Sequence, residues 1–95
     1  MMASGTIQAK YDNKRNSSDG IDFDNEMRPF VYATAGSSTG TLPVNNNGYL
    51  FTYVRDASAT KVQFYVTAGS NTSKTLYMRR MWQGAWEAWT SITFS

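Results

Sequence analysis

The stretch Met81–Ile92, MWQGAWEAWTSI, holds all three tryptophans of the chain beside a Gln-Gly turn signal. Period-two alternation of apolar and polar residues dominates the chain, and the segments Thr75–Trp82 and Ala85–Phe94 flank that signal. Such alternation is typical of β-strands, and two strands separated by a two-residue turn form a hairpin. We therefore expect the chain to close with a hairpin that turns at Gln83 and Gly84.

The spacing of the last two tryptophans does not fit an unbroken strand. Trp86 and Trp89 would then point to opposite faces, because successive side chains alternate. A bulge or break near Ala88 would return both indoles to one side, and so would a stretch of extended backbone with three residues per turn. A thin domain that is covered on both faces is a further solution.

Working outward from this hairpin, other short segments alternate with period two between turn-rich stretches. They are Thr6–Tyr11, weakly, and Phe30–Ala35, Tyr49–Arg55 and Lys61–Thr67. The polar stretches Asp12–Gly20, Gly36–Gly48 and Gly69–Lys74 are expected to be loops. Asp22 or Asp24 can cap one helical turn before Pro29. The pattern predicts a mostly β fold, a small antiparallel domain of hairpins with at most one short helix.

Composition narrows the function classes. The chain has 95 residues, of which 41% are hydrophobic and 17% charged, so we expect one globular domain. The net charge of +2 is too small, and the basic residues too scattered, to favour nucleic acid as a partner. Cysteine and histidine are absent, which excludes thiol nucleophiles, disulfides, the usual zinc sites and Ser-His-Asp chemistry. No apolar run is long enough for membrane insertion.

Burial of large apolar side chains supplies most of the stability that we expect of so small a chain. Val62, Phe64 and Val66 share one face of their predicted strand, and burying a tryptophan contributes roughly 2–3 kcal/mol from apolar area. The predicted core consists of Trp86, Trp89, Ile92, Phe64, Val62 and Val66. We also expect Arg79 or Arg80 to pack over an indole face.

A second interpretation of the aromatic residues is a surface that binds carbohydrate. Sugar C–H faces stack on aromatic rings, and sugar hydroxyls need hydrogen-bond donors and acceptors nearby. Trp82, beside the turn, is the tryptophan that we expect to be exposed. The candidate ligand-binding residues are Trp82, Tyr53, Arg55, Tyr49, Asn46, Asn47, Arg79 and Tyr77. The competing interpretation places most of these tyrosines in the core, with their hydroxyls at its rim.

Acidic residues do not form a recognisable reactive site. Asp22, Asp24 and Glu26 have the alternate spacing of a calcium loop, but the glycine at its sixth position and the acid at its twelfth are missing. We expect no metal there and assign these side chains to capping and solvation. Glu87 lies between two tryptophans without an obvious second carboxylate, so a glycosidase pair is not expected.

The segment Thr75–Ile92 resembles the closing hairpin of the pyocin-knob domains of bacteriophage tail fibres and related bacteriocin fibres. Those hairpins have an aromatic strand carrying arginine, a turn with glycine, and then tryptophan, two residues, tryptophan and a terminal aliphatic residue. Weaker upstream matches extend the resemblance over residues 21–95: Asp22–Asn25 with Pro29–Tyr32, Pro43 with Asn47–Leu50, and Val62–Tyr65. The sequence departs from the family at Phe30, where glycine is frequent, and in residues 1–20.

The resemblance implies a knob-like β domain over residues 21–95, with residues 1–20 as a strand, a loop or a linker to an upstream fibre. It implies a homotrimer on the virion, in a tail fibre or tailspike, outside the cell at the host surface. The implied function is non-catalytic recognition of bacterial cell-surface polysaccharide or lipopolysaccharide without a cofactor. Two rival hypotheses are a trimerising or capping module without a ligand and a fragment of a polysaccharide-degrading tail protein.

Overall fold

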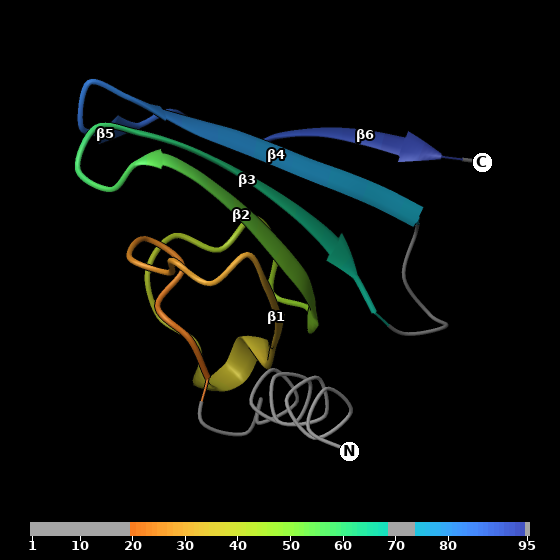
Figure 1. Ribbon diagram of the computed structural model, residues 1–95. Coiled ribbons are helices and arrows are strands. Elements are labelled where there is room, and N and C mark those ends of the chain that lie inside the picture. Colours follow the sequence, from red (N-terminus) through yellow and green to blue (C-terminus); the bar gives the residue numbers. More distant parts are fainter. Residues whose placement is uncertain (1–19, 69–73, 95) are drawn as a thin grey trace, which may run out of the picture.

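The computed structural model describes residues 20–68 and 74–94, and these form one antiparallel sheet (Figure 1). Its strands are β1 (Phe30–Ala33), β2 (Gly48–Asp56), β3 (Thr60–Thr67), β4 (Lys74–Trp82), β5 (Ala85–Trp86) and β6 (Thr90–Phe94). The order is β1-β2-β3-β4-β5, and β6 also pairs with β4. The predicted antiparallel β fold is confirmed.

Two hairpins are present, and the second is the predicted closing hairpin. β2 and β3 pair antiparallel, with a register shift between Val54 and Asp56. Gln83 and Gly84 connect β4 to β5 with φ angles of 53° and 84°. Two successive positive φ angles match the twist of the flanking strands and favour glycine, which explains the Gln-Gly signal.

The predicted last strand is interrupted, so the break near Ala88 is the one of the three solutions to its tryptophan spacing that the structure adopts. β5 ends at Trp86 and β6 begins at Thr90, so the break spans residues 87–89 and includes Ala88. β5 pairs with Met81 and Trp82 of β4, and β6 pairs with Lys74–Met78. The two short strands therefore lie one after the other along the same edge of β4.

Helical structure is limited to one 3-10 turn among the described residues, η2 (Ala35–Ser37). It does not lie at Asp22 or Asp24, where a helical turn was predicted. The Asp22 carboxylate instead accepts hydrogen bonds from the Asp24 N–H and the Asn25 amide, and the Asp22 carbonyl accepts one from the Asn25 N–H. A short acidic side chain can accept hydrogen bonds from the backbone two residues on, so it stabilises a tight turn without a helix.

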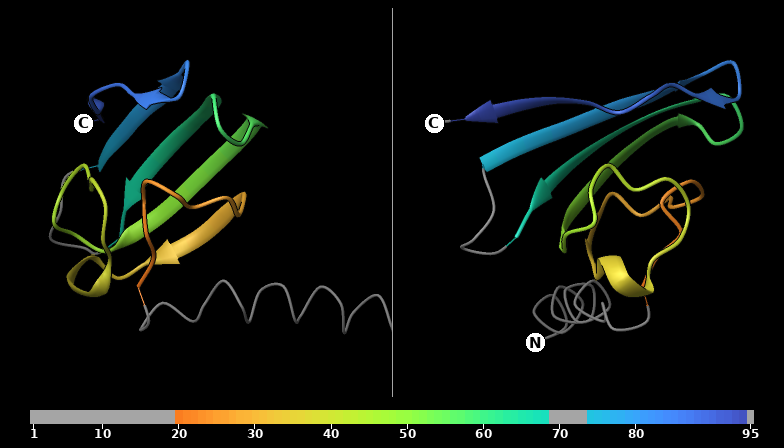
Figure 2. Two further views of the ribbon diagram at one scale, coloured as in Figure 1. Left: turned by 90° about the vertical axis from the view of Figure 1, so that its left-hand side faces the viewer. Right: turned by 180° about the vertical axis from the view of Figure 1, so that it is seen from behind.

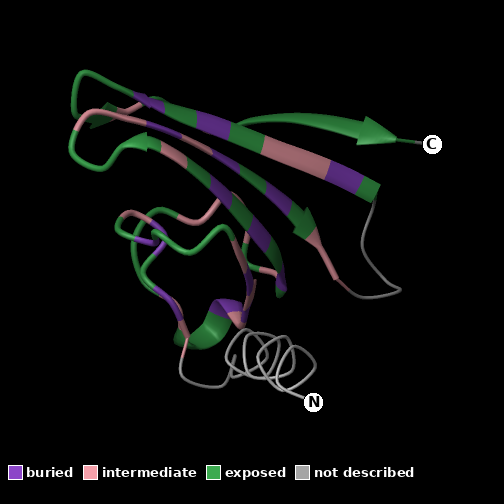
Figure 3. Ribbon diagram, in the orientation of Figure 1, coloured by how far each residue is buried: buried purple, intermediate pink, exposed green. Residues whose placement is uncertain are grey.

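One face of the sheet is covered by the irregular segment that precedes and follows β1. This loop layer, residues 20–29 and 34–47, lies against the sheet near β1 and β2, while β6 extends away from it (Figures 1 and 2). The buried core between the two layers consists of Ile21, Phe23, Val31, Ala33, Leu50 and Tyr65. Burial alternates along β2, β3 and β4 (Figure 3), as expected for a sheet covered on one side.

Gly48 permits the close approach on which this core depends. A Cβ atom there would lie 2.7 Å from Tyr65 Cζ and 2.4 Å from the Val66 carbonyl oxygen. The fully buried Tyr65 ring crosses this position, and its hydroxyl donates a hydrogen bond of 2.6 Å to the Asn46 carbonyl. Only glycine leaves room for the ring.

The predicted core is partly wrong about which face is buried. Phe64 and Val66 are exposed and Val62 is only half-buried, whereas Lys61, Gln63 and Tyr65 face the loop layer. Irregular backbone presents N–H and C=O groups that need partners. Polar side chains therefore belong on the covered face.

Ile92 is also outside the core, with 61% of its surface exposed, because every residue of β6 lies beyond the loop layer. Trp86 and Trp89 do face the loop layer, and both are half-buried. The predicted strand Thr6–Tyr11 lies outside the described residues, as do nearly all of the Asp12–Gly20 loop and residues 69–73. No helix in the described part of the chain has the length and apolar character to span a membrane.

Candidate functional site

The covered face of the sheet is organised around a buried arginine. Arg79 is 2% exposed, and its Nε donates a hydrogen bond of 2.8 Å to Gln63 Oε1. Its Nη2 donates to the Phe23 carbonyl at 3.1 Å and to Asp24 Oδ1 at 3.0 Å. Burial lowers the pKa of the guanidinium, and the Asp24 carboxylate partly offsets this shift. Arg79 thus ties β4 to β3 and to the loop layer.

The last two tryptophans enclose this guanidinium. Arg79 Cζ lies 4.0 Å from the ring centroid of Trp86 and 4.6 Å from that of Trp89, so the predicted packing of an arginine over an indole is confirmed. The Trp86 N–H donates to the Asp24 carbonyl at 3.1 Å, and the Trp89 N–H to the Thr41 carbonyl at 2.8 Å. Both indoles therefore hold the loop layer onto the sheet.

The acidic residues of the loop layer have structural partners. Glu26 forms a two-pronged ion pair with Arg28, with both N–O distances 2.8 Å. Burial by itself would raise the pKa of Glu26, but hydrogen bonds from the Arg28 side chain and backbone lower it overall. Among the described residues no group of three metal-ligating side chains comes together.

The opposite face of the sheet carries no second layer in the described chain. Its side chains form rows that cross the strands in the observed register. One row reads Tyr32, Tyr49, Val66, Leu76 and Ile92; the next reads Phe30, Phe51, Phe64, Met78 and Thr90. A third row reads Tyr53, Val62 and Arg80. We call this surface the open face.

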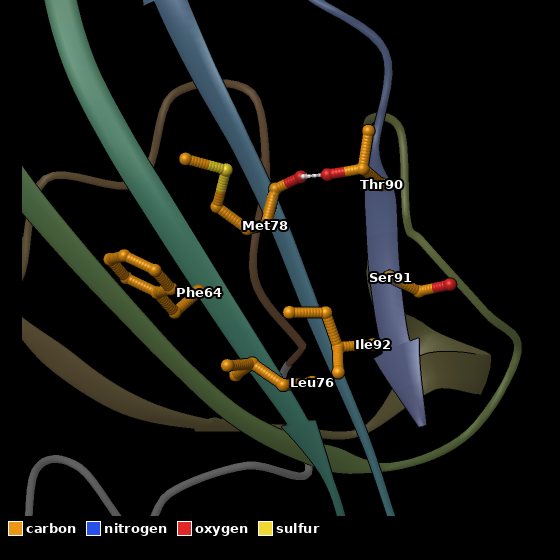
Figure 4. A pocket seen from close by; sticks show the side chains of 6 residues that line it. All are labelled: Phe64, Leu76, Met78, Thr90, Ser91 and Ile92. Carbon is orange, nitrogen blue, oxygen red and sulfur yellow. Dashed lines mark hydrogen bonds between the residues drawn. The ribbon is translucent and has the colours of Figure 1, made fainter. Parts of the chain in front are cut away.

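The first two rows and Phe94 form an apolar patch at one end of the open face. Phe30 stacks on Tyr49 with ring centroids 6.4 Å apart and packs on Phe51 at 5.0 Å. A pocket of about 230 Å³ lies farther along the same rows, between β3, β4 and β6. In Figure 4, Phe64, Leu76, Met78 and Ile92 extend toward this pocket, whereas Ser91 points away from it.

A basic-aromatic hollow occupies the other end of the open face. Its volume is about 260 Å³, and the residues that line it are Tyr53, Arg55, Thr60, Lys61, Val62, Met78, Arg80, Met81 and Trp82. Tyr53 and Trp82 are 70% and 56% exposed. The hollow has β2 on one side, β4 on the other and β3 as its floor.

The charge of the hollow is positive. The Arg55 side chain is exposed and makes no hydrogen bond or ion pair with any residue of the described chain. Arg80 donates to Glu87 at 2.6 Å, and both side chains of this pair are exposed. Lys61 contributes little, because its side chain lies on the covered face, 5.3 Å from the Trp86 ring. No described aspartate or glutamate lines the hollow.

The structure brings together three of the predicted ligand-binding residues and separates the others. Trp82, Tyr53 and Arg55 meet at the hollow. Tyr49 lies in the apolar patch. Asn46 and Asn47 precede β2, about eight extended residues or roughly 25 Å from Arg55, and both accept hydrogen bonds within the fold. The prediction of a ligand-binding role is corrected for Arg79 and Tyr77, because both side chains face the core and do not belong to an exposed surface.

Sequence reasoning missed Arg80 as a site residue, although a signal was present. Arg80 and Trp82 are two positions apart on one strand, and so are Tyr53 and Arg55 on another. Residues two apart in a strand share a face. Pairing these strands through β3 places both pairs around the same hollow.

No protein-family model, curated protein or solved structure matches this chain.

Proposed function

We propose that this domain is a non-catalytic receptor-binding module that recognises bacterial surface glycan, at the tip of a phage tail fibre or tailspike. The observation that carries the proposal is the hollow, where two exposed aromatic rings and an unpaired guanidinium lie on β2 and β4, on either side of β3. Rings offer stacking surfaces to sugar C–H faces, and guanidinium N–H groups donate to oxygens. A rigid sheet keeps these groups in place before the ligand arrives.

The exposed apolar patch supports this assignment, because it is suited to self-association. The four exposed aromatic side chains of the patch, Tyr49, Phe51, Phe64 and Phe94, are 37–54% exposed, which at about 200 Å² each leaves roughly 350 Å² of aromatic surface in water. Patches on monomers reach about 300–600 Å², and the exposed Val66, Met78 and Ile92 enlarge this one. We therefore assign the apolar patch to contacts between three copies of the chain, which leave the hollow accessible.

Three copies make weak sugar binding effective. A hollow of about 260 Å³ is slightly smaller than the roughly 300–1,000 Å³ of typical ligand pockets, so each site has modest affinity. Linking such sites raises the apparent affinity by roughly 10²–10⁴. The module then adheres to a cell surface that displays many identical sugars.

The glycan-binding part is tested with a fluorescent fusion of the chain on a panel of bacterial strains and on purified surface polysaccharides. Trp82→Ala and Tyr53→Ala should each abolish binding, while Trp82→Phe and Tyr53→Phe, which keep a ring for stacking, retain most of it. Both positions are exposed, so circular dichroism should show an unchanged fold. Binding that survives both alanine substitutions would contradict the location of the site.

Self-association is tested by sedimentation equilibrium. The parent chain should have three times its monomer mass, and Phe64→Glu combined with Ile92→Glu should give monomers. Ser58→Glu, in the exposed turn between β2 and β3, adds charge away from the patch and should leave the trimer intact. A parent chain that remains monomeric at all accessible concentrations would contradict the assignment of the patch.

A structural module without a ligand is the second candidate, and the size of the apolar patch favours it. The two proposals differ at the hollow. A trimer that binds no strain, and whose assembly is indifferent to Trp82→Ala, would support the structural role.

A further inference from the structure

The hollow carries positive charge that a neutral sugar would not require. Two of the side chains that line the hollow, Arg55 and Arg80, place a positive charge on the open face. No described carboxylate lines the hollow to balance this charge. Asp56, the acid in the β2–β3 turn, accepts hydrogen bonds of 3.1 Å from the N–H and hydroxyl of Ser58 through its Oδ1, and it forms no ion pair with Arg55. The charge of Arg55 is therefore left for a ligand.

The two guanidinium groups face a common space. Arg55 lies on β2 and Arg80 on β4, with only β3 between them, so their strands are about 10 Å apart. Short side chains of β3, Thr60 and Val62, lie between them. A planar guanidinium binds carboxylate or phosphate through two parallel hydrogen bonds, which a lysine does not match.

The pair formed by Arg80 and Glu87 does not neutralise the hollow permanently. Both side chains are about half-exposed, at 60% and 46%. Exposed ion pairs contribute little to stability and open readily. An anionic ligand can therefore compete with Glu87 for Arg80.

Resting on the proposed function, we infer that the hollow selects an anionic sugar unit. Its carboxylate or phosphate group is held by Arg55, with Arg80 as a second donor. Tyr53 and Trp82 contact the C–H face of the same unit. Neutral sugars bind more weakly because they leave Arg55 unpaired.

Matched ligand pairs test this selectivity by calorimetry on the full chain. Oligogalacturonate is compared with its methyl ester, and mannose 6-phosphate with mannose. The acidic member of at least one pair should bind at least about tenfold more tightly, as a charge-assisted hydrogen bond requires, and added salt should reduce this advantage. The pair that shows the advantage identifies carboxylate or phosphate as the bound group.

Three variants separate the hollow from general charge effects. Arg55→Gln should remove the preference for the acidic member, while Lys74→Gln, which removes the same charge near the far end of the open face, should preserve it. Glu87→Gln should strengthen binding of the acidic member several-fold, because it frees Arg80. A gain of this kind cannot come from a damaged fold.

These experiments distinguish a failure of the anionic selectivity from a failure of the proposed glycan-binding function. Equal affinity for acidic and neutral members would overturn the selectivity and leave the glycan-binding function standing. Binding of neither the matched ligands nor any bacterial surface glycan would overturn the proposed function itself. Acidic preference that persists in Arg55→Gln would overturn the role of this arginine.

Discussion

Replacing the buried arginine gives the most direct test of how this small domain is held together. In Arg79→Met, the apolar stem of the side chain is kept but three hydrogen bonds, to Gln63, Phe23 and Asp24, are lost. Asp24 then loses its charged partner, and the two indoles lose the cation between them.

The expected cost is large for a chain of this size. The Asp24 carboxylate left behind is 36% exposed and adds little, but Gln63 Oε1 and the Phe23 carbonyl each lose a charged donor in the buried interior, at about 1.5–3 kcal/mol each. The total unfolding free energy of about 95 residues is roughly 5–14 kcal/mol. The substitution should therefore cost about 3 kcal/mol or more, which is roughly a fifth of the stability at the least. With a urea dependence of about 1–3 kcal/mol per molar, the unfolding midpoint falls by about 2 M.

Urea unfolding followed by tryptophan fluorescence measures this loss, since two of the three indoles contact Arg79 and report its environment. Arg80→Met is the matched control, because the neighbouring arginine is exposed and pairs only at the surface. Its midpoint should lie close to that of the parent chain. If Arg79→Met and Arg80→Met unfold at the same urea concentration, the structural role assigned to the enclosed guanidinium is refuted.

Three further outcomes are expected. Gly48→Ala should destabilise the fold by about 1–3 kcal/mol, since a methyl group there meets the Tyr65 ring. Gly36→Ala should be nearly neutral, because its added Cβ has no neighbour within 4 Å. Thermal unfolding of the two variants compares these effects. Tyr65→Phe should cost about 1 kcal/mol in urea unfolding, because the Asn46 carbonyl loses its donor. Burial opposes the lowered pKa of Glu26, but hydrogen bonds from the adjacent arginine outweigh it, so the stability this carboxylate provides is present above its unfolded pKa. The stability that Glu26 contributes should disappear as the pH falls below about 4.5, and it should be absent at every pH in Glu26→Gln. Identical acid-unfolding profiles of the parent chain and the variant would contradict the assigned ion pair.

The strands and turns of this protein follow from local patterns. Period-two alternation predicts the long strands within a few residues, and Gln83-Gly84 supplies the two positive φ angles of the tight turn. The spacing of Trp86 and Trp89 anticipates the break that separates β5 from β6. These features depend on backbone sterics and on neighbours a few positions away.

The choice of the covered face depends on contacts far apart in the chain. The alternation of β3 shows that Val62, Phe64 and Val66 share one side but does not show whether a second layer lies on it. The loop layer covers the other side, because Gln63 and Arg79 reach the Phe23 carbonyl across 40 and 56 residues. The predicted core was wrong about Val62, Phe64 and Val66 for that reason.

The candidate site also depends partly on local sequence and partly on tertiary contacts. Aromatic and basic residues two positions apart are visible in the sequence as two pairs, Tyr53 with Arg55 and Arg80 with Trp82, each on one face of its strand. Their meeting around one hollow requires β3 to pair with β2 on one edge and β4 on the other. Strand order is set by which faces bury the most surface and satisfy the most polar groups, and those terms arise only once the whole chain has packed.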